Sequence, residues 1–268
     1  MVERTISSWD EFDNLVFADS WNADIERHRS NLVFRGLPDR KYDLLPSLNR
    51  VCGPKLELEK PLIRNFAKYS LMDNKQSANF WETISLAQHH GLPTRLLDWT
   101  FSPYVALHFA TENFAYYDAD CAIWCMDFVK SHEYLPNTLK QTLSAHYANG
   151  FSVEMLNEVA SDFESLLALE KTSRPFVLFF EPPSLDSRII NQYALFSVMS
   201  NPATTVTDWL LDHEDLYFKI IIPAKLKLEF RDKLDQINMT ERMIYPGLDG
   251  LCKWLARHYT PRENIYRE

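Results

Sequence analysis

The sequence predicts a single α+β domain in which helices flank a central mixed, mainly antiparallel sheet. Amphipathic helical patterns lie mainly in the first and last thirds of the chain, and short apolar runs rich in β-branched and aromatic residues lie in the middle. No G-x-G-x-x-G or G-x-x-x-x-G-K-[ST] motif follows any of these runs, and the chain has only 6 glycines in 268 residues. A parallel, doubly wound nucleotide-binding sheet is therefore disfavoured.

The first third of the chain predicts three helices and one strand. Residues 8–19 predict a helix, because Ser8 and Glu11 form an S-x-x-E capping pattern ahead of apolar residues at helical spacing. Residues 31–36 predict a strand that ends at Gly36 and the turn residues after it. Further helices are predicted over residues 56–72 and 77–91, the second with Gly91 at its C-terminal cap position.

The rest of the chain predicts the remaining strands and four more helical regions. An extended segment at 93–100 leads into a helix for which Ser102 is the N-cap and Pro103 the first residue. Further strands are predicted over residues 121–127, 175–180, 188–198 and 216–222. Residues 130–172 predict a helical insertion on the sheet, and helices at 225–236 and 248–259 end the chain. We therefore expect one domain over residues 1–268, with its core at about 25–260.

The charge composition limits the partners of this protein. The chain has 28 basic and 37 acidic residues, a net charge of −9, and a pI of about 5.4. Nonspecific nucleic-acid binding needs a basic excess and is therefore disfavoured. An acidic N-terminal segment and the lack of an apolar stretch of about 18 residues predict a cytoplasmic protein with no membrane partner. The cysteines and histidines lack the spacing of metal ligands, so no metal is expected.

The tripeptide Phe34-Arg35-Gly36 is the first candidate for a functional site. An arginine at a strand end can bind a phosphate or a carboxylate through two parallel hydrogen bonds. Gly36 would allow a ligand to approach the backbone closely. The alternative is that Arg35 forms a structural ion pair beside a turn glycine.

The segment from Gln88 to Thr100 is the second candidate. Polar side chains gather here around a helix end and a strand, and burying them costs free energy unless they bind one another or a ligand; they are Gln88, His89, Arg95, Asp98 and Thr100. They therefore predict either a ligand site or a self-contained network. In such a network Asp98 would pair with Arg95, and His89 would cap carbonyl groups at the helix end.

The third candidate lies in the predicted strand at 188–198. Residues two apart in a strand share a face, so Arg188, Ile190 and Gln192 would point the same way. A polar side chain among apolar neighbours is either a binding residue or a core glutamine satisfied by nearby backbone.

These features together resemble the FRG family, a group of mostly bacterial proteins named after an F/Y-R-G motif. The resemblance covers nearly the whole chain and is carried by five segments, which are Phe34 to Gly36, Leu44 to Leu48, Gln88 to Ala110, Arg188 to Gln192 and Pro246 to Gly250. It implies one FRG-type domain in which Arg35 and the Gln88 to Thr100 segment form a single site.

A more distant resemblance is to the ADP-ribosyltransferases, through an arginine on an early strand, a Thr/Ser-containing strand before a helix, and a polar residue on a late strand. It implies an ADP-ribosyltransferase-like fold with NAD as substrate and without a metal. Arg35 would support the phosphates or ribose, and Thr100 with Ser102 would hold the nicotinamide side. Gln192 stands where the family has a glutamate. A neutral amide stabilises a sugar cation less than a carboxylate does, so Asp98 or Glu181 would take that role.

Three functional hypotheses follow from these residues. The first is a cleft that binds NAD or a related small nucleotide and transfers ADP-ribose to water or to a macromolecular acceptor; its lining would be Arg35, His89, Arg95, Asp98, Thr100 and Gln192. The second is a non-catalytic binding or regulatory module in a bacterial defence, phage-defence or toxin system. The third is that the polar cluster serves only to stabilise the fold. The sequence predicts no oligomeric state.

Overall fold

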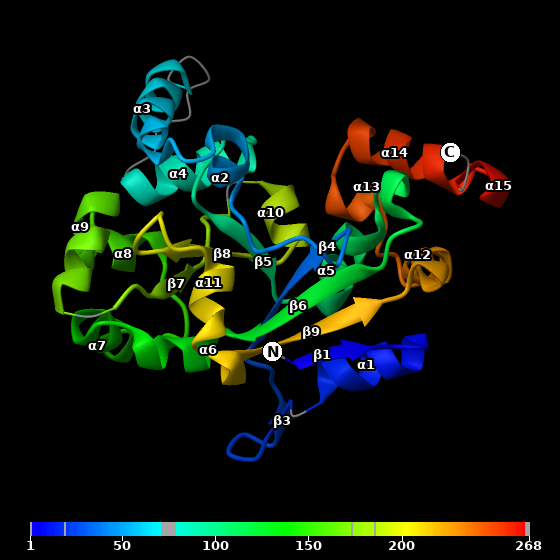
Figure 1. Cartoon of the computed structure of the whole chain (residues 1–268), viewed down its shortest axis with the longest axis horizontal. Helices are drawn as coiled ribbons and strands as arrows, with labels where there is room; N and C mark the ends of the chain where they lie inside the picture. Colours follow the sequence, from blue (N-terminus) through cyan, green and yellow to red (C-terminus); the bar gives the residue numbers. More distant parts are fainter. Residues whose placement is uncertain (1, 19, 71–78, 173, 185, 266–268) are drawn as a thin grey trace.

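A seven-stranded sheet is the centre of the computed structural model, which describes residues 2–18, 20–70, 79–172, 174–184 and 186–265 (Figure 1). Its strands are β1 (Val2–Thr5), β4 (Leu32–Leu37), β5 (Leu97–Thr100), β6 (Cys121–Asp127), β7 (Val177–Phe180), β8 (Ala194–Met199) and β9 (Tyr217–Ile222). Their order is β1-β9-β6-β4-β5-β8-β7. Only the β1–β9 pair in this sheet is parallel. The predicted α+β class with a mainly antiparallel sheet is confirmed.

Helices and one hairpin surround this sheet. The hairpin pairs β2 (Trp21–Asn22) with β3 (Arg27–His28). The helices are α1 (Trp9–Phe17), α2 (Ser47–Cys52), α3 (Glu59–Ser70), α4 (Phe80–His89), α5 (Pro103–Thr111), α6 (Phe128–Ser131), α7 (Asn137–Ala145), α8 (Val153–Val159), α9 (Phe163–Ala168), α10 (Ser187–Asn191), α11 (Val206–Leu211), α12 (Lys227–Gln236), α13 (Glu241–Ile244), α14 (Leu248–His258) and α15 (Arg262–Ile265). Among the described residues, no helix is both long and apolar enough to span a membrane.

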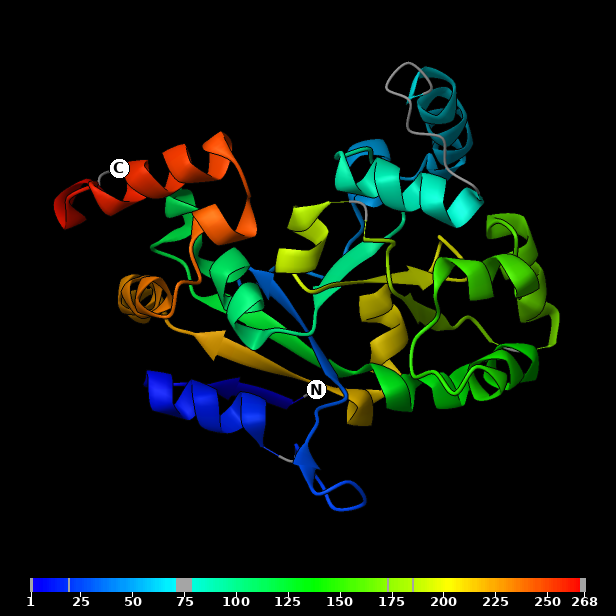
Figure 2. The same cartoon turned by 180° about the vertical axis from the view of Figure 1, so that it is seen from behind.

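One face of the sheet carries two separate apolar clusters. Residues paired across neighbouring strands have their side chains on the same face of the sheet. This face therefore carries five residues of β4, β5 and β8, which are Phe34, Asp98, Thr100, Ala194 and Phe196. At the β9 end, α1, α5 and α12 bury residues such as Phe12 and Phe230. At the β7 end, α4 and α7 to α9 form the other cluster. Figure 2 shows α1 (blue) and α12 (orange) at one end and α7 to α9 (green) at the other. The part of this face over β5, between α5 and α4, is left open.

The opposite face of the sheet packs against α11. Trp209 and Leu210 of this helix are buried with Trp99 and Phe179 of the strands. Trp99 is fixed there because its Nε1 donates a hydrogen bond to Ser197 Oγ at 2.8 Å.

Most predicted elements are present, and their caps explain why. Ser8 caps α1 by accepting from Glu11 N at 3.2 Å, and Ser102 caps α5 with Pro103 at the start of the helix. Gly91 follows the end of α4 with φ of 83°, a left-handed conformation that glycine adopts without steric cost. The region 130–172 is helical as predicted, and its helices pack on β7 and β8. That the region 130–172 is an insertion stays a prediction. Residues 71 and 72 of the helix predicted at 56–72, and residues 77 and 78 of the helix predicted at 77–91, lie outside the described residues.

The predicted strand at 188–198 is wrong in its first half. Residues 187–191 form α10, because the Asp186 carboxylate caps the helix by accepting from Arg188 N and Ile189 N. The apolar pair Ile189 and Ile190 belongs to this short helix, and β8 begins only at Ala194. The sequence interpretation also missed β1, since its four residues are exposed and show no apolar alternation.

Candidate functional site

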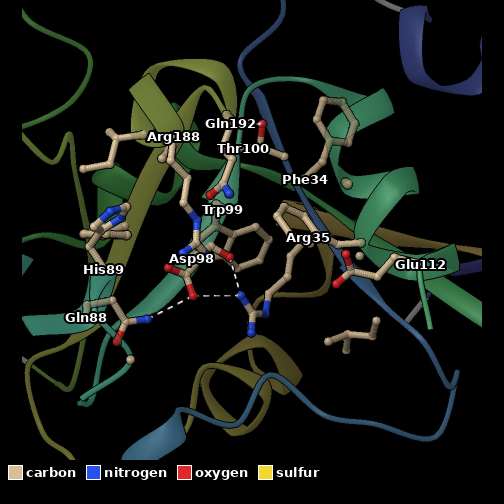
Figure 3. A pocket seen from close by; sticks show the side chains of 18 of the residues that line it. Phe34, Arg35, Gln88, His89, Asp98, Trp99, Thr100, Glu112, Arg188 and Gln192 are labelled. Atoms are coloured by element: carbon tan, nitrogen blue, oxygen red, sulfur yellow. Dashed lines mark hydrogen bonds and ion pairs between the residues drawn. The ribbon is translucent and has the colours of Figure 1, made fainter. Parts of the chain in front are cut away.

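A cavity of about 730 Å³ opens on the sheet face that carries Phe34, Asp98 and Thr100, at the point where β4 and β5 separate. β4 pairs with β6 along its whole length from Leu32 to Leu37. It pairs with β5 only at Phe34 and Thr100. Beyond that pair the strands diverge, and α4, α5 and α10 supply the other walls of the opening. Figure 3 shows side chains from β4, β5, α4 and α10 converging on it.

Arg35 fills the gap between the separating strands. Its Nη1 donates to the backbone oxygen of Asp98 at 2.5 Å, which replaces a hydrogen bond that a closed sheet would have made. The same nitrogen lies 3.7 Å from Asp98 Oδ2, and the side chain is 15% exposed. Burial lowers the pKa of Arg35, and the neighbouring Arg50 lowers it as well, while Asp98 raises it. The attraction of Asp98 outweighs the repulsion from Arg50, so burial is what leaves the pKa of Arg35 lowered.

Asp98 is the most exposed of the polar groups that contact Arg35. Its side chain is 56% exposed, and Oδ2 accepts from Gln88 Nε2 at 2.9 Å. Gln88 is held in turn by Thr94, whose Oγ1 donates to Gln88 Oε1 at 2.5 Å. The carboxylate is thus oriented by α4 on one side and by Arg35 on the other, with one edge open to the cavity (Figure 3).

The expected pairing of Asp98 with Arg95 is wrong. Arg95 binds Glu59 instead, through Nε to Oε2 at 2.7 Å and through its backbone N–H to Oε1 at 3.0 Å. Its guanidinium lies 3.8 Å from the centre of the Phe163 ring. Residues three apart along an extended segment point to opposite faces. Arg95 therefore stabilises the packing of α3, and it does not line the cavity.

Thr100 and Gln192 join β5 to α10 at the edge of the cavity. Thr100 Oγ1 donates to the backbone oxygen of Gln192 at 2.7 Å, and it accepts from Ser102 N at 3.0 Å. The Gln192 side chain lines the cavity, yet its Nε2 donates to the backbone oxygen of Ile244 at 3.2 Å. Gln192 is the C-cap of α10 rather than a strand residue.

Gly36 lines the cavity, but helix packing explains why it is a glycine. A Cβ at this position would lie 1.8 Å from the backbone oxygen of Ala106 in α5. The absence of a side chain therefore lets α5 lie directly on β4. Helix packing alone therefore explains the glycine at position 36, and the expected approach of a ligand to its backbone stays a prediction.

His89 lines the cavity from the end of α4. Its Nε2 lies 2.5 Å from Asp186 Oδ2, so it fastens α4 to the start of α10 rather than capping its own helix. Burial raises the pKa of Asp186, but the hydrogen bonds from Ile189 N–H and His89 outweigh this effect and the net pKa is lowered. Asp186 thus remains a carboxylate that orders one wall of the cavity.

Two of the sequence-predicted residues lie elsewhere. Ser102 caps α5 by accepting from Val105 N at 3.4 Å, and it is not part of the cavity lining. Glu181 follows β7 and lines a second cavity. The structure therefore brings Arg35, Gly36, Gln88, His89, Asp98, Thr100 and Gln192 together, and leaves Arg95, Ser102 and Glu181 out.

Two arginines of the cavity were missed as site residues. Arg50 of α2 and Arg188 of α10 line it with Arg35, so three guanidinium groups meet in a protein of net charge −9. Arg188 lies four residues before Gln192, and a helix places such residues on one face. Within the described residues, the buried Nε atoms of Arg35 and Arg188 have no hydrogen-bond partner. Buried donors without partners are rare in folded proteins, and these two border the same opening.

Glu112, at the end of α5, is a second carboxylate of the cavity that the sequence interpretation missed. It accepts from Tyr245 Oη at 2.9 Å and lies 3.4 Å from His108 Nε2. An arginine can only donate, so the 2.9 Å contact of Arg231 Nη1 with His108 Nδ1 places the histidine proton on Nε2, toward Glu112. Burial lowers the pKa of His108. Tyr245 therefore holds this carboxylate through a hydrogen bond, and the His108 ring lies beside it.

The last helices support this side of the cavity through buried charges. Glu241 accepts from Arg231 Nη2 at 2.8 Å and from Arg257 Nε at 2.6 Å. Burial raises the pKa of Glu241, but both arginines outweigh this effect and lower the pKa to about 2. The Arg188 guanidinium lies 5.2 Å from the centre of the Tyr245 ring. The α13 region thus binds both α5 and α10.

Residues 30–119 match the FRG domain, which supports the resemblance over about a third of the chain. The matched segment includes Arg35, Asp98 and Glu112, whereas Arg188 and Gln192 lie after it. Neither the curated proteins nor the solved structures include a significant match to this chain.

Proposed function

From the FRG match and the arginine-lined cavity, we propose that this protein binds a nucleotide that carries a diphosphate, with NAD as the first ligand to test. The observation that carries the proposal is the meeting of Arg35, Arg50 and Arg188 at one cavity, with the buried Nε atoms of Arg35 and Arg188 unpartnered. A volume of about 730 Å³ is within the range of small-molecule and cofactor sites.

A diphosphate would supply acceptors for the buried arginine donors of the cavity. The Nε atoms of Arg35 and Arg188 have no hydrogen-bond partner among the described residues. A guanidinium matches phosphate oxygens with two parallel donors, so each arginine can bind two of them. Such hydrogen bonds to charged groups contribute about 1.5–3 kcal/mol each, which is a factor of about 10 to 100 in affinity.

Asp98 is the carboxylate that we propose for the chemistry of ADP-ribose transfer or hydrolysis. In that reaction the bond between the ribose C1 atom and the nicotinamide nitrogen breaks. Nicotinamide leaves with the electron pair, and water or an acceptor nucleophile bonds to C1. The ribose becomes cationic in the transition state, and a fixed carboxylate stabilises it. Gln88 and Arg35 would hold Asp98 for this role, while the neutral Gln192 would bind a ribose hydroxyl group.

One observation favours a binding module without catalysis. The amide of Gln192 is engaged with the Ile244 carbonyl at 3.2 Å, and it carries no charge with which to stabilise a sugar cation. If Asp98 does not reach the ribose of the bound nucleotide, nucleotide binding would signal to a partner without turnover.

Calorimetric titration with NAD, ADP-ribose and nicotinamide tests the binding proposal. We expect wild type to bind NAD and ADP-ribose, and Arg35→Ala to weaken both by about 10- to 100-fold. Arg64→Ala is the matched control, since Arg64 is exposed on α3 and outside the cavity. Circular dichroism checks that each variant is folded. Equal affinity in wild type and a folded Arg35→Ala variant would overturn the proposal.

Release of nicotinamide from NAD distinguishes the enzyme from the binding module. Asp98→Asn keeps the size and the hydrogen-bonding reach of the side chain but removes its charge. We expect it to retain ADP-ribose affinity within about threefold and to lose turnover by at least 100-fold, as is typical for removal of one stabilising group. A wild-type protein that binds NAD without releasing nicotinamide would support the binding module instead.

A further inference from the structure

A second cavity of about 630 Å³ lies beside the first and has a different lining. The two cavities share Ile189 and Ala194. Arg188 and Gln192 of the α10 segment border the first, whereas Ile190 and Tyr193 border the second. The α10 segment, which lies beside β8 in Figure 1, is therefore a common wall between them.

Aromatic rings form one side of this second cavity. Phe101 lies between two others, with its ring centre 4.9 Å from that of Tyr193 and 5.7 Å from that of Phe128. Tyr193 is 60% exposed, so its ring is accessible to a ligand. Tyr193 therefore offers an accessible ring face on which a planar group can stack, while Phe101 contacts it and Phe128 is buried.

The backbone holds Tyr193 in an unfavourable conformation. Its φ is 48°, in the left-handed region that bulky residues rarely adopt. Hydrogen bonds on both sides maintain it, from Tyr193 N to Ile190 O at 3.0 Å and from Phe101 N to Tyr193 O at 3.1 Å. Strain of this kind concentrates at functional sites. Here it turns an exposed aromatic side chain toward the mouth of a cavity instead of the core.

The charge of this cavity is opposite to the arginine excess of the first. Glu181 is the only charged residue among its described lining residues. It is exposed, and its carboxylate makes no hydrogen bond or ion pair with any described residue. The amide side chains of Asn31 and Asn149 also line the cavity. An anionic group that lines the same cavity as an accessible aromatic ring, with no cation among the described lining residues to neutralise it, favours a cationic ligand.

We infer that the second cavity binds a guanidinium group, such as the side chain of an arginine residue in a peptide. A guanidinium stacks on an aromatic face and forms two parallel hydrogen bonds with a carboxylate. Tyr193 and Glu181 supply these two partners. A lysine ammonium group has no planar face to stack, so a guanidinium fits this lining better. The inference concerns a site outside the nucleotide cavity and holds whether or not a nucleotide binds there.

Titration with Nα-acetyl-L-arginine methylamide, in the absence of nucleotide, tests the inference. The matched probe is the citrulline analogue, which has the same shape without the charge. We expect wild type to bind the arginine probe at least 10-fold more tightly than the citrulline probe. Glu181→Gln and Tyr193→Ala should each weaken the arginine probe by at least 10-fold.

Glu57→Gln is the matched control variant, because Glu57 is exposed and lies outside both cavities. We expect it to bind the arginine probe as wild type does. The Arg35→Ala variant should also bind it normally, which separates this site from the nucleotide site. Equal affinity for the two probes, or wild-type affinity in folded Glu181→Gln, would overturn the inference.

Discussion

Replacing Gly36 by alanine tests whether the glycine serves helix packing or ligand approach. The added Cβ would lie 1.8 Å from the Ala106 oxygen and 2.8 Å from the Ala110 nitrogen, both in the backbone of α5. Carbon atoms in folded proteins do not approach an oxygen this closely, so α5 or β4 has to move by about 1 Å. A flexible side chain could rotate away, but a helix backbone moves only with its neighbours.

The expected cost follows from what α5 buries. Ala106, Leu107 and Ala110 are each at most 1% exposed and pack in the apolar cluster with Phe34. A gap of about 1 Å removes a quarter to a half of the dispersion energy of each contact across it. Overpacked cores lose about 1–3 kcal/mol, and a clash with backbone belongs at the upper end. We therefore expect Gly36→Ala to lose about 3 kcal/mol, which lowers the melting temperature by roughly 6–12 °C for a domain of this size.

Thermal and urea denaturation of Gly36→Ala and Gly150→Ala provide the comparison. Gly150 is the control, because its added Cβ would meet only a Phe128 side-chain atom at 3.7 Å. An alanine there should change the stability by less than about 1 kcal/mol, in either direction. If Gly36→Ala melts within 2 °C of wild type and yet loses nucleotide binding, the packing argument is refuted and Gly36 serves the ligand.

Two further substitutions test the assignments outside the cavity. Arg95→Ala leaves the carboxylate of Glu59, which is 1% exposed, without its partner, so we expect a loss of about 3–5 kcal/mol in urea denaturation. The nucleotide affinity of the folded variant should be unchanged. A 10-fold loss of affinity without a loss of stability would show that Arg95 belongs to the nucleotide site. His132 is 8% exposed, and burial lowers its pKa from 6.5 to about 4. Because the unfolded chain binds this proton more readily than the folded one, protonation of His132 destabilises the folded protein. Its contribution to the free energy of unfolding is fully present above pH 6.5 and is lost as the pH falls toward 4, a change of about 3 kcal/mol. His132→Phe should remove that part of the pH dependence, and identical slopes in the two proteins would contradict the assignment.

Local signals in the sequence predicted most of the helices and strands. Ser8, Ser102 and Pro103 mark helix starts through contacts within a few residues, which is why α1 and α5 begin where expected. The strand Cys121–Asp127 matches its prediction at both ends, since a continuous apolar run flanked by polar residues defines it. The prediction failed at 188–191 because an apolar run is compatible with either a strand or a helix. The Asp186 cap decides between them.

The sequence pointed to several residues of the candidate site but not to the pairing of its charges. Arg35 and the Gln88 to Thr100 segment pointed to one site, and Arg35, Gln88 and Asp98 do meet. The partners of Arg95 and Asp98 were not predictable, because Glu59 and Arg35 lie 36 and 63 residues away along the chain. Arg50 and Glu112 carry no motif that separates them from surface charges, and the Arg188 to Gln192 segment pointed to Gln192 rather than to Arg188.

The sequence by itself determined the α+β class and most element boundaries, because these depend on periodicity and on capping within one turn of chain. The expected strand end at Arg35 is wrong, because β4 continues to Leu37 and pairs with β6 along its whole length. Only the tertiary structure decided that β4 and β5 separate after Phe34, since this depends on where α5 and α10 pack. It also decided which charges face one another across that opening. Three arginines on β4, α2 and α10 line one cavity only when the sheet and its helices assemble, and the proposal of an anionic ligand rests on this arrangement.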